Sequence, residues 1–107
     1  MKKGEYIINS NDIQNLKKLG FRHIGDGVYV LEFTGYKWRG FVTITCRFTA
    51  FDDNKTILID VFTENGEYYS PYYKDEKTNS VLSVIKSNIT KEIKRCKIEY
   101  KENDTES

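Results

Sequence analysis

The clearest pattern of hydrophobic and polar positions runs from Phe41 to Phe51. Apolar side chains occupy every second position there, and threonines or Arg47 lie between them. A period of two is typical of a β-strand with one buried face. The apolar positions are Val42, Ile44, Cys46, Phe48 and Ala50. This segment therefore predicts a sheet that turns one face to the core and the other to solvent.

Shorter apolar segments on either side predict the remaining strands. We expect these at residues 21–24, 28–34, 56–64 and 67–73. Turn sequences separate them: Gly25-Asp26-Gly27, a loop at 35–40, a four-residue turn at 52–55, and Asn65-Gly66. Asn-Gly is a strong hairpin signal. Pro71 marks the last strand as an edge, because proline cannot donate to a central ladder.

Two segments have a helical period instead. Ile13, Leu16 and Leu19 recur every three residues before Gly20, which predicts a short helix capped by Ser10-Asn11-Asp12. From about residue 78 a longer helix is expected, beginning at Thr78, Asn79 or Ser80. Its apolar face comprises Val81, Leu82, Ile85, Ile89, Ile93 and Cys96.

These elements predict an α+β fold. We expect a two-layer sandwich in which an antiparallel sheet of three to five strands packs one face against the short N-terminal helix and the long C-terminal helix, because both helices need cover for an apolar side. A single domain spans residues 1–98, and residues 99–107 form a polar, flexible tail.

The strand register follows from matching side chains across the hairpins. A turn at 52–55 places Ala50, Phe48 and Cys46 opposite Ile57, Ile59 and Val61 on the core face. On the open face it places Thr49, Arg47 and Thr45 opposite Leu58, Asp60 and Phe62. Slipping the strands by one residue would spoil both matches. Extension to the neighbouring hairpins pairs Leu31 with Ile44, Val30 with Thr45, Thr63 with Tyr68, and Phe62 with Tyr69.

This register predicts two rows on the open face. One comprises Val30, Thr45, Phe62 and Tyr69, and the other Glu32, Thr43, Glu64 and Glu67. The apolar row is either ordinary exposed surface, or covered by a terminus or loop, or a partner-binding face. The glutamates either form a solvated row or bind a metal cation together, and Glu64 and Glu67 flank the turn as like charges.

The segment Tyr68-Tyr69-Ser70-Pro71-Tyr72-Tyr73 holds four tyrosines in six residues. Tyrosine supplies rigid amphipathic contact area, which suits binding, although an edge strand that packs alternate rings on the core is the simpler interpretation. The candidate partner-binding residues are Val30, Trp38, Phe62, Tyr69, Tyr72 and Tyr73. This hypothesis requires that Phe62 and Tyr69 are not buried within the monomer.

The exposed side of the long helix is basic. Residues 80–98 hold five basic residues and one acid, Glu92. The basic residues are Lys86, Lys91, Lys94, Arg95 and Lys97. They suit either a solvated helix, whose last turn favours cations, or a surface for nucleic acid or another acidic partner.

The composition excludes several classes of protein function. The chain has 107 residues, 14% aromatic, which argues for one folded domain and against disorder. Lys and Arg number 17 against 16 Asp and Glu, so a wholly basic nucleic-acid binder is excluded. Cys46, Cys96 and the single histidine, His23, make neither a disulfide scaffold nor a zinc site. No phosphate-loop, dinucleotide or metalloprotease motif is present, so we expect no enzymatic activity and no cofactor.

The N-terminus shows no signal-peptide pattern and no segment is apolar enough to span a membrane, so we expect a cytoplasmic protein without membrane partners. The leading hypothesis is a small non-enzymatic protein that binds another protein. By compositional analogy it resembles accessory or inhibitory proteins of phages and mobile elements. The alternatives are nucleic-acid binding through the basic helix and the tyrosine segment, and a cation site at Glu32, Glu64 and Glu67. The protein is a monomer, or a homodimer formed by strand addition at a sheet edge.

Overall fold

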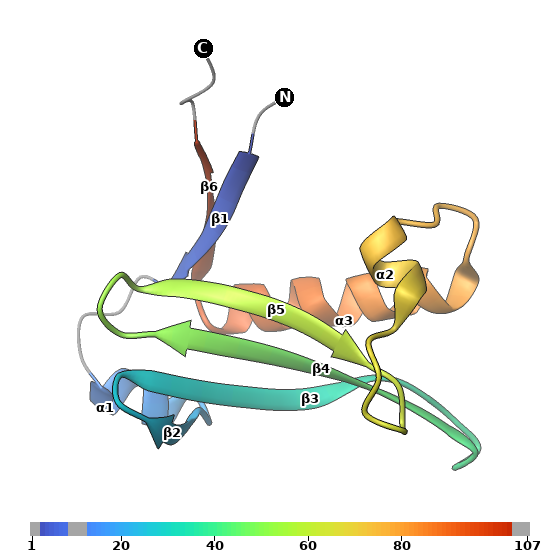
Figure 1. Cartoon of the computed structure of the whole chain (residues 1–107), viewed down its shortest axis with the longest axis horizontal. Helices are drawn as coiled ribbons and strands as arrows, with labels where there is room; N and C mark the ends of the chain where they lie inside the picture. The colour runs from blue at the N-terminus through green and yellow to red at the C-terminus, as the bar shows by residue number, and fades with distance from the viewer. Residues whose placement is uncertain (1–2, 9–12, 104–107) are drawn as a thin grey trace.

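The computed structural model describes residues 3–8 and 13–103, and this part of the chain forms one antiparallel sheet of six strands with three helices (Figure 1). The strands follow the order β2-β3-β4-β5-β1-β6 across the sheet. In chain order the elements are β1 (Lys3–Ile8), α1 (Ile13–Lys18), β2 (Arg22–Gly25), β3 (Val28–Trp38), β4 (Val42–Phe51), β5 (Thr56–Phe62), α2 (Ser70–Lys74), α3 (Ser80–Arg95) and β6 (Ile98–Asn103). The α+β class is as predicted, but the sheet has more strands than the expected three to five.

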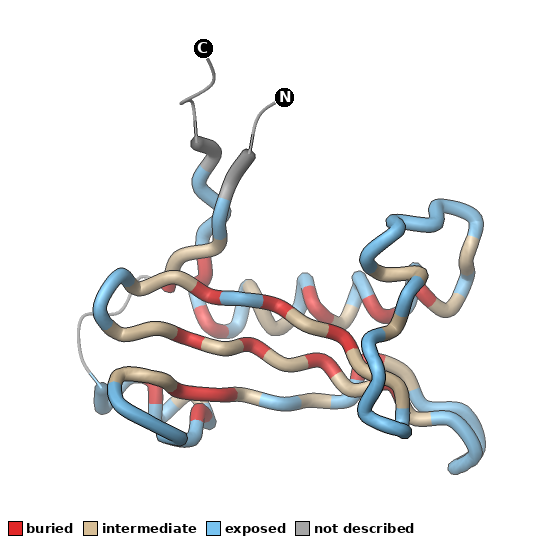
Figure 2. Tube along the Cα trace, viewed as in Figure 1, coloured by how far each residue is buried: buried red, intermediate tan, exposed pale blue. Residues whose placement is uncertain are grey.

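The core lies between the sheet and the helices α1 and α3. Leu16 of α1 and Ile85 and Ile89 of α3 join one buried cluster with the inward side chains of the strands. Buried positions recur along β4, β5 and α3 (Figure 2). Both predicted helices therefore pack on the same face. The largest fully buried side chains are Phe48, Leu82, Ile85, Val61 and Cys46. Val42, also expected in the core, is 36% exposed because it lies beside the turn that ends the β3–β4 hairpin.

The central hairpin has the predicted register. Cys46, Phe48 and Ala50 of β4 face Val61, Ile59 and Ile57 of β5, and Thr45 faces Phe62. The helix ends are also as predicted where they are described. The side chain of Asn79 accepts a hydrogen bond from the Leu82 N–H at 3.0 Å, and Gly20 ends α1 with a φ of 103°. The proposed cap at residues 10–12 lies outside the described residues.

The register of the β3–β4 hairpin differs from the prediction. Residues 35–38 belong to β3 rather than to a loop, and the chain reverses at Arg39 and Gly40, which have φ angles of 48° and 75°. A bulge between Thr34 and Tyr36 absorbs one residue. Leu31 therefore lies opposite Phe48, not Ile44, and Val30 opposite Thr49, not Thr45.

The prediction of a strand at residues 67–73 is wrong. Only an isolated bridge between Phe62 and Tyr68 continues the hairpin, so Tyr68 takes the place predicted for Tyr69. The chain then enters the short helix α2, with Pro71 in its first turn. Proline suits that position, because its fixed φ is helical and its missing N–H is not needed there.

Two strands were missed at the chain ends. β1 pairs with β5 at Tyr6–Ile57 and Ile7–Thr56, and it pairs along its full length with β6. Residues 99–103, expected in the tail, therefore belong to the sheet, while residues 104–107 lie outside the described residues. Ile8 of β1 and Ile98 of β6 are buried in the core cluster and Tyr6 packs against it, so these two short strands are held by their mutual pairing and by a few apolar contacts.

Gly35 sets how closely α3 approaches the sheet. A Cβ atom at this position would lie 2.5 Å from the Cys46 Sγ and 3.5 Å from the Ile85 Cγ2. The Gly35 carbonyl accepts a hydrogen bond from the Asn88 Nδ2 of α3 at 2.7 Å. The missing side chain thus lets the bulge, the helix and β4 meet at one point.

We expect Gly35→Ala to lower the free energy of unfolding by about 1–3 kcal/mol, because the added methyl group overpacks the contact with Cys46. Urea unfolding measures the change. Gly25→Ala is the matched control, because a Cβ atom there meets nothing within 4 Å. Equal stability of the two variants would contradict this account of the helix contact.

Candidate functional site

The tyrosine-rich segment lies along an edge of β5 that β1 leaves uncovered. β1 pairs with β5 only at Thr56 and Ile57. Farther along the same edge, the Tyr69 N–H donates to the Val61 carbonyl at 2.8 Å, and the Thr63 N–H donates to the Glu67 carbonyl at 2.7 Å. The segment therefore covers the second half of the β5 edge and positions α2 beside it (Figure 1).

The Tyr73 hydroxyl holds α2 to this edge. It accepts a hydrogen bond from the Val61 N–H at 3.1 Å and donates one to the Asp60 Oδ1 at 2.7 Å. Partial burial and the nearby Asp60 carboxylate raise the pKa of Tyr73, although the Val61 hydrogen bond acts in the opposite direction. The hydroxyl thus takes the place of a strand partner for Val61.

Four rings form a continuous series around this point, which we call the aromatic cluster: Phe62, Tyr68, Tyr73 and Tyr72. Phe62 and Tyr68 stack with centroids 5.1 Å apart, and Tyr68 meets Tyr73 edge-to-face at 5.3 Å. The Arg47 guanidinium lies over the Phe62 ring, 4.7 Å from its centroid. Tyr68 is 63% exposed and Tyr73 47%, so the cluster presents aromatic surface to solvent.

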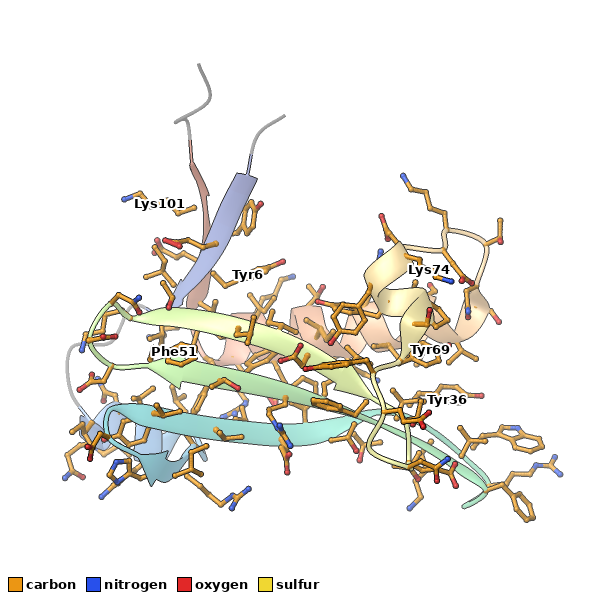
Figure 3. All side chains as sticks on the ribbon, in the orientation of Figure 1. Tyr6, Tyr36, Phe51, Tyr69, Lys74 and Lys101 are labelled. Atoms are coloured by element: carbon orange, nitrogen blue, oxygen red, sulfur yellow. The ribbon has the colours of Figure 1, made fainter. Side chains whose placement is uncertain are left out.

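Two hollows flank the aromatic cluster. The larger, of about 520 Å³, lies between β1, α2 and α3 and is lined by Tyr6, Tyr72, Tyr73, Asp75, Lys86, Ile89, Thr90 and Ile93. Tyr6 lies on the wall that β1 supplies (Figure 3). The second, of about 440 Å³, is lined by Asp60, Tyr68, Ser70 and Tyr73. Burial is the main cause that raises the pKa of Tyr72 to about 12.

The predicted partner-binding residues do not form one surface. Tyr72, Tyr73 and Phe62 come together in the aromatic cluster. Val30 is only 4% exposed, so its expected place on a binding face is wrong. Trp38 lies at the tip of the β3–β4 hairpin, where its ring faces Phe41 at 6.1 Å.

Tyr69 and Phe62 are both half-buried, and Phe62 lies opposite Tyr68 rather than Tyr69. The Tyr69 ring packs on the core, and its hydroxyl is 3.4 Å from the Asn79 Nδ2, which donates to it. The predicted row of Val30, Thr45, Phe62 and Tyr69 therefore does not exist. Neither Phe62 nor Tyr69 is buried within the monomer, as the binding hypothesis requires.

Sequence reasoning missed Tyr68, Arg47 and Tyr6 as site residues. Tyr68 was assigned one position away from the bridge that it makes, and this slip reversed the predicted faces of Tyr68 and Tyr69. Arg47 was expected to pair with Asp60. It lies opposite Asp60 in the register, but its side chain binds Glu32 at 2.8 Å and covers Phe62. Tyr6 was not a candidate because no strand was expected at residues 3–8, where the structure has β1.

The proposed glutamate site is not assembled. Glu32 pairs with Arg47 and lies 3.7 Å from Arg22, while Glu64 and Glu67 are exposed residues of the turn region after β5. Lys37, not Glu32, lies opposite Thr43, so the predicted row of Glu32, Thr43, Glu64 and Glu67 is also wrong. Across residues 3–8 and 13–103, the structure has no group of three or more His, Cys, Asp or Glu side chains that could hold a metal ion.

The basic residues of α3 and of the turn that follows it divide into two groups. Lys86 forms an ion pair with Asp75, and Arg95 binds Glu92 and donates to the Leu19 carbonyl. The Lys86 ammonium lowers the pKa of Asp75. Lys91, Lys94 and Lys97 are exposed and have no ion-pair partner among the described residues. The unpaired basic residues of this segment therefore number three among the described residues rather than the five that the sequence predicts.

Both cysteines are buried and unpaired with each other. Burial raises the pKa of Cys46 to about 12 and also raises that of Cys96. Because only the thiolate is a strong nucleophile, neither cysteine is suited to nucleophilic chemistry in the folded protein.

Comparisons with known proteins found no matching family model, and neither a curated protein nor a solved structure matches the chain. Among the described residues, no helix is long and apolar enough to cross a membrane.

We expect Tyr73→Phe to lower the free energy of unfolding by about 1 kcal/mol, because the Val61 N–H and the Asp60 carboxylate lose their shared partner while ring packing is kept. Tyr68→Phe is the control, because its hydroxyl makes no hydrogen bond in the described structure and its loss should change stability by less than about 0.5 kcal/mol. Urea unfolding compares them. An unchanged Tyr73→Phe variant would exclude the hydroxyl as the contact that holds α2.

Proposed function

We propose that the chain is a small binding protein that acts on another protein through the aromatic cluster. The observation that carries this proposal is the exposed series of rings from Phe62 to Tyr73, with the Arg47 guanidinium stacked at its end. Tyrosine and arginine are enriched among residues that dominate the energy of protein interfaces.

The surroundings of the cluster support this proposal. Tyr73 is held in place by its two hydrogen bonds, and Arg47 by Glu32, so a partner would meet side chains that are already ordered. Such preorganisation lowers the entropy cost of association. The hollows on either side of Tyr73 give room for partner side chains. An inhibitory or accessory role of the phage or mobile-element type remains part of the proposal.

The test uses Tyr68→Ala, because Tyr68 is exposed and contacts only the neighbouring rings among the described interactions. A tagged native chain should retain a specific protein from cells that express it. The purified partner should bind Tyr68→Ala at least tenfold more weakly, since losing an anchor side chain costs about 2 kcal/mol or more.

Phe41→Ala is the matched control. Phe41 is 71% exposed at the tip of the β3–β4 hairpin, so it presents a comparable aromatic ring on a different element. Full affinity in Phe41→Ala and weak affinity in Tyr68→Ala would support the cluster. The reverse pattern would move the interface to Trp38 and the hairpin tip, and the absence of any retained protein would contradict the proposal.

Nucleic-acid binding is the alternative, and the exposed residues Lys91, Lys94 and Lys97 favour it. If it holds, a fluorescent oligonucleotide should bind at low salt and lose affinity steeply as salt rises. Lys91→Ala combined with Lys94→Ala should flatten the salt dependence, because fewer counterions are released. Lys86→Ala is the control, because Lys86 is engaged by Asp75. No detectable binding at low salt would exclude this alternative.

A further inference from the structure

The outer strand β6 has one side without a strand partner among the described residues. It lies at the end of the sheet order and pairs only with β1. Glu99, Tyr100 and Lys101 are all exposed, and the Lys101 side chain points away from β1 (Figure 3). An exposed edge of this kind is a template for a further strand.

Successive residues of a strand direct their N–H and C=O groups to opposite sides, so the pairing with β1 determines which β6 residues have these groups on the unpaired side. The Ile8 N–H donates to the Lys55 carbonyl, so the even residues of β1 point toward β5 and the odd ones toward β6. Glu5 and Ile7 lie opposite Lys101 and Glu99. Residues 99, 101 and 103 therefore bond to β1, while Ile98, Tyr100 and Glu102 direct their N–H and C=O groups to the free side.

A second copy of β6 can pair antiparallel only when outward residues meet outward residues. A two-fold axis at Tyr100 satisfies this condition, because Tyr100 meets its symmetry mate and Ile98 meets residue 102. Axes at residues 99 and 101 satisfy it as well. Axes that fall between two residues oppose an outward residue to an inward one and leave the backbone groups unpaired.

Side-chain charge separates the remaining registers. An axis at residue 99 would place two glutamates opposite each other, and an axis at 101 would oppose two lysines. The axis at Tyr100 instead places Glu99 opposite Lys101 of the second copy, and the symmetry repeats this pair on the other side. These are non-hydrogen-bonded positions, where facing side chains are closest, so opposite charges there are stabilising.

We propose that two copies of the chain associate through β6, antiparallel and with the two-fold axis at Tyr100, which joins two six-stranded sheets into one. The Tyr100 ring also packs edge-to-face on Tyr6 of β1, with centroids 4.9 Å apart, and Tyr100 remains 53% exposed. The two copies bring their Tyr100 residues together, so the interface gains apolar contact beside its backbone hydrogen bonds.

Sedimentation equilibrium of the full chain tests the proposal. The native chain should pass from monomer to dimer as its concentration rises from micromolar to millimolar. Lys101→Glu should raise the dissociation constant by about tenfold, because it puts like charges at both symmetric pairs. The combined swap of Glu99→Lys and Lys101→Glu restores opposite charges across the axis and should restore association.

The combined swap also controls for folding. Both variants place a glutamate at residue 101, opposite Glu5 of β1, so any loss of β1–β6 pairing from this like-charge contact is the same in both. Tyr100→Cys should form a disulfide-linked dimer on mild oxidation, because Cα atoms of a hydrogen-bonded pair lie about 5.5 Å apart. Tyr68→Cys is the control for random cross-linking.

A native chain that stays monomeric at millimolar concentration would overturn the proposal. A combined variant as weak as Lys101→Glu would overturn the register. Tyr68→Ala should dimerise normally, so loss of partner binding through the aromatic cluster and loss of dimerisation are separate results.

Discussion

The close approach of α3 to the sheet at Gly35 is the constraint on which the two-layer arrangement depends. At this point the β3 bulge, Cys46 of β4 and Ile85 of α3 lie within contact of one another, and Asn88 binds the bulged carbonyl. The contact fixes the height of the helix above the strands. The helix itself begins at its Asn79 cap, and the segment between β5 and α3 folds back along the edge of the sheet.

That return segment explains why the candidate site lies where it does. β1 pairs with β5 only at Tyr6 and Ile7, and the rest of this β5 edge would otherwise be open to pairing with other chains. The protein covers it with one backbone hydrogen bond from Tyr69 and one side-chain hydrogen bond to Tyr73. Covering an edge with tyrosines places their rings at the surface, so the same residues protect the sheet and form the aromatic cluster.

The parts of the fold that sequence predicted well are those with strong local patterns. The β4–β5 hairpin follows from strict alternation, and α3 from its apolar spacing and the cap at Asn79. Residues whose structure depends on distant partners were not predictable in this way. β1 and β6 pair with each other although they are far apart in the sequence, and the bulge at Gly35 lies against residues of α3 that are distant from it along the chain.

The sequence identified most residues of the candidate site but not how they are arranged. The tyrosine segment and Phe62 were correctly singled out, but one residue of register error at Tyr68 exchanged the exposed and inward rings. The Glu32–Thr43 pair failed for a different reason: residues 35–38 extend β3, so the chain reverses at Arg39 and Gly40 and Glu32 lies opposite Arg47. An alternating pattern predicts which side chains share a face of the sheet only up to the next turn or bulge, because a one-residue shift there moves the following side chains to the other face.

The pairing of β1 with strands that are distant in sequence has a consequence for the order of folding. Tyr6 pairs with both Ile57 and Tyr100. The hairpins of β3, β4 and β5 involve short loops and can close early, whereas β1 needs partners that are far from it along the chain. High sequence separation of this kind slows folding, so β1 and β6 join the sheet after the central hairpins have formed.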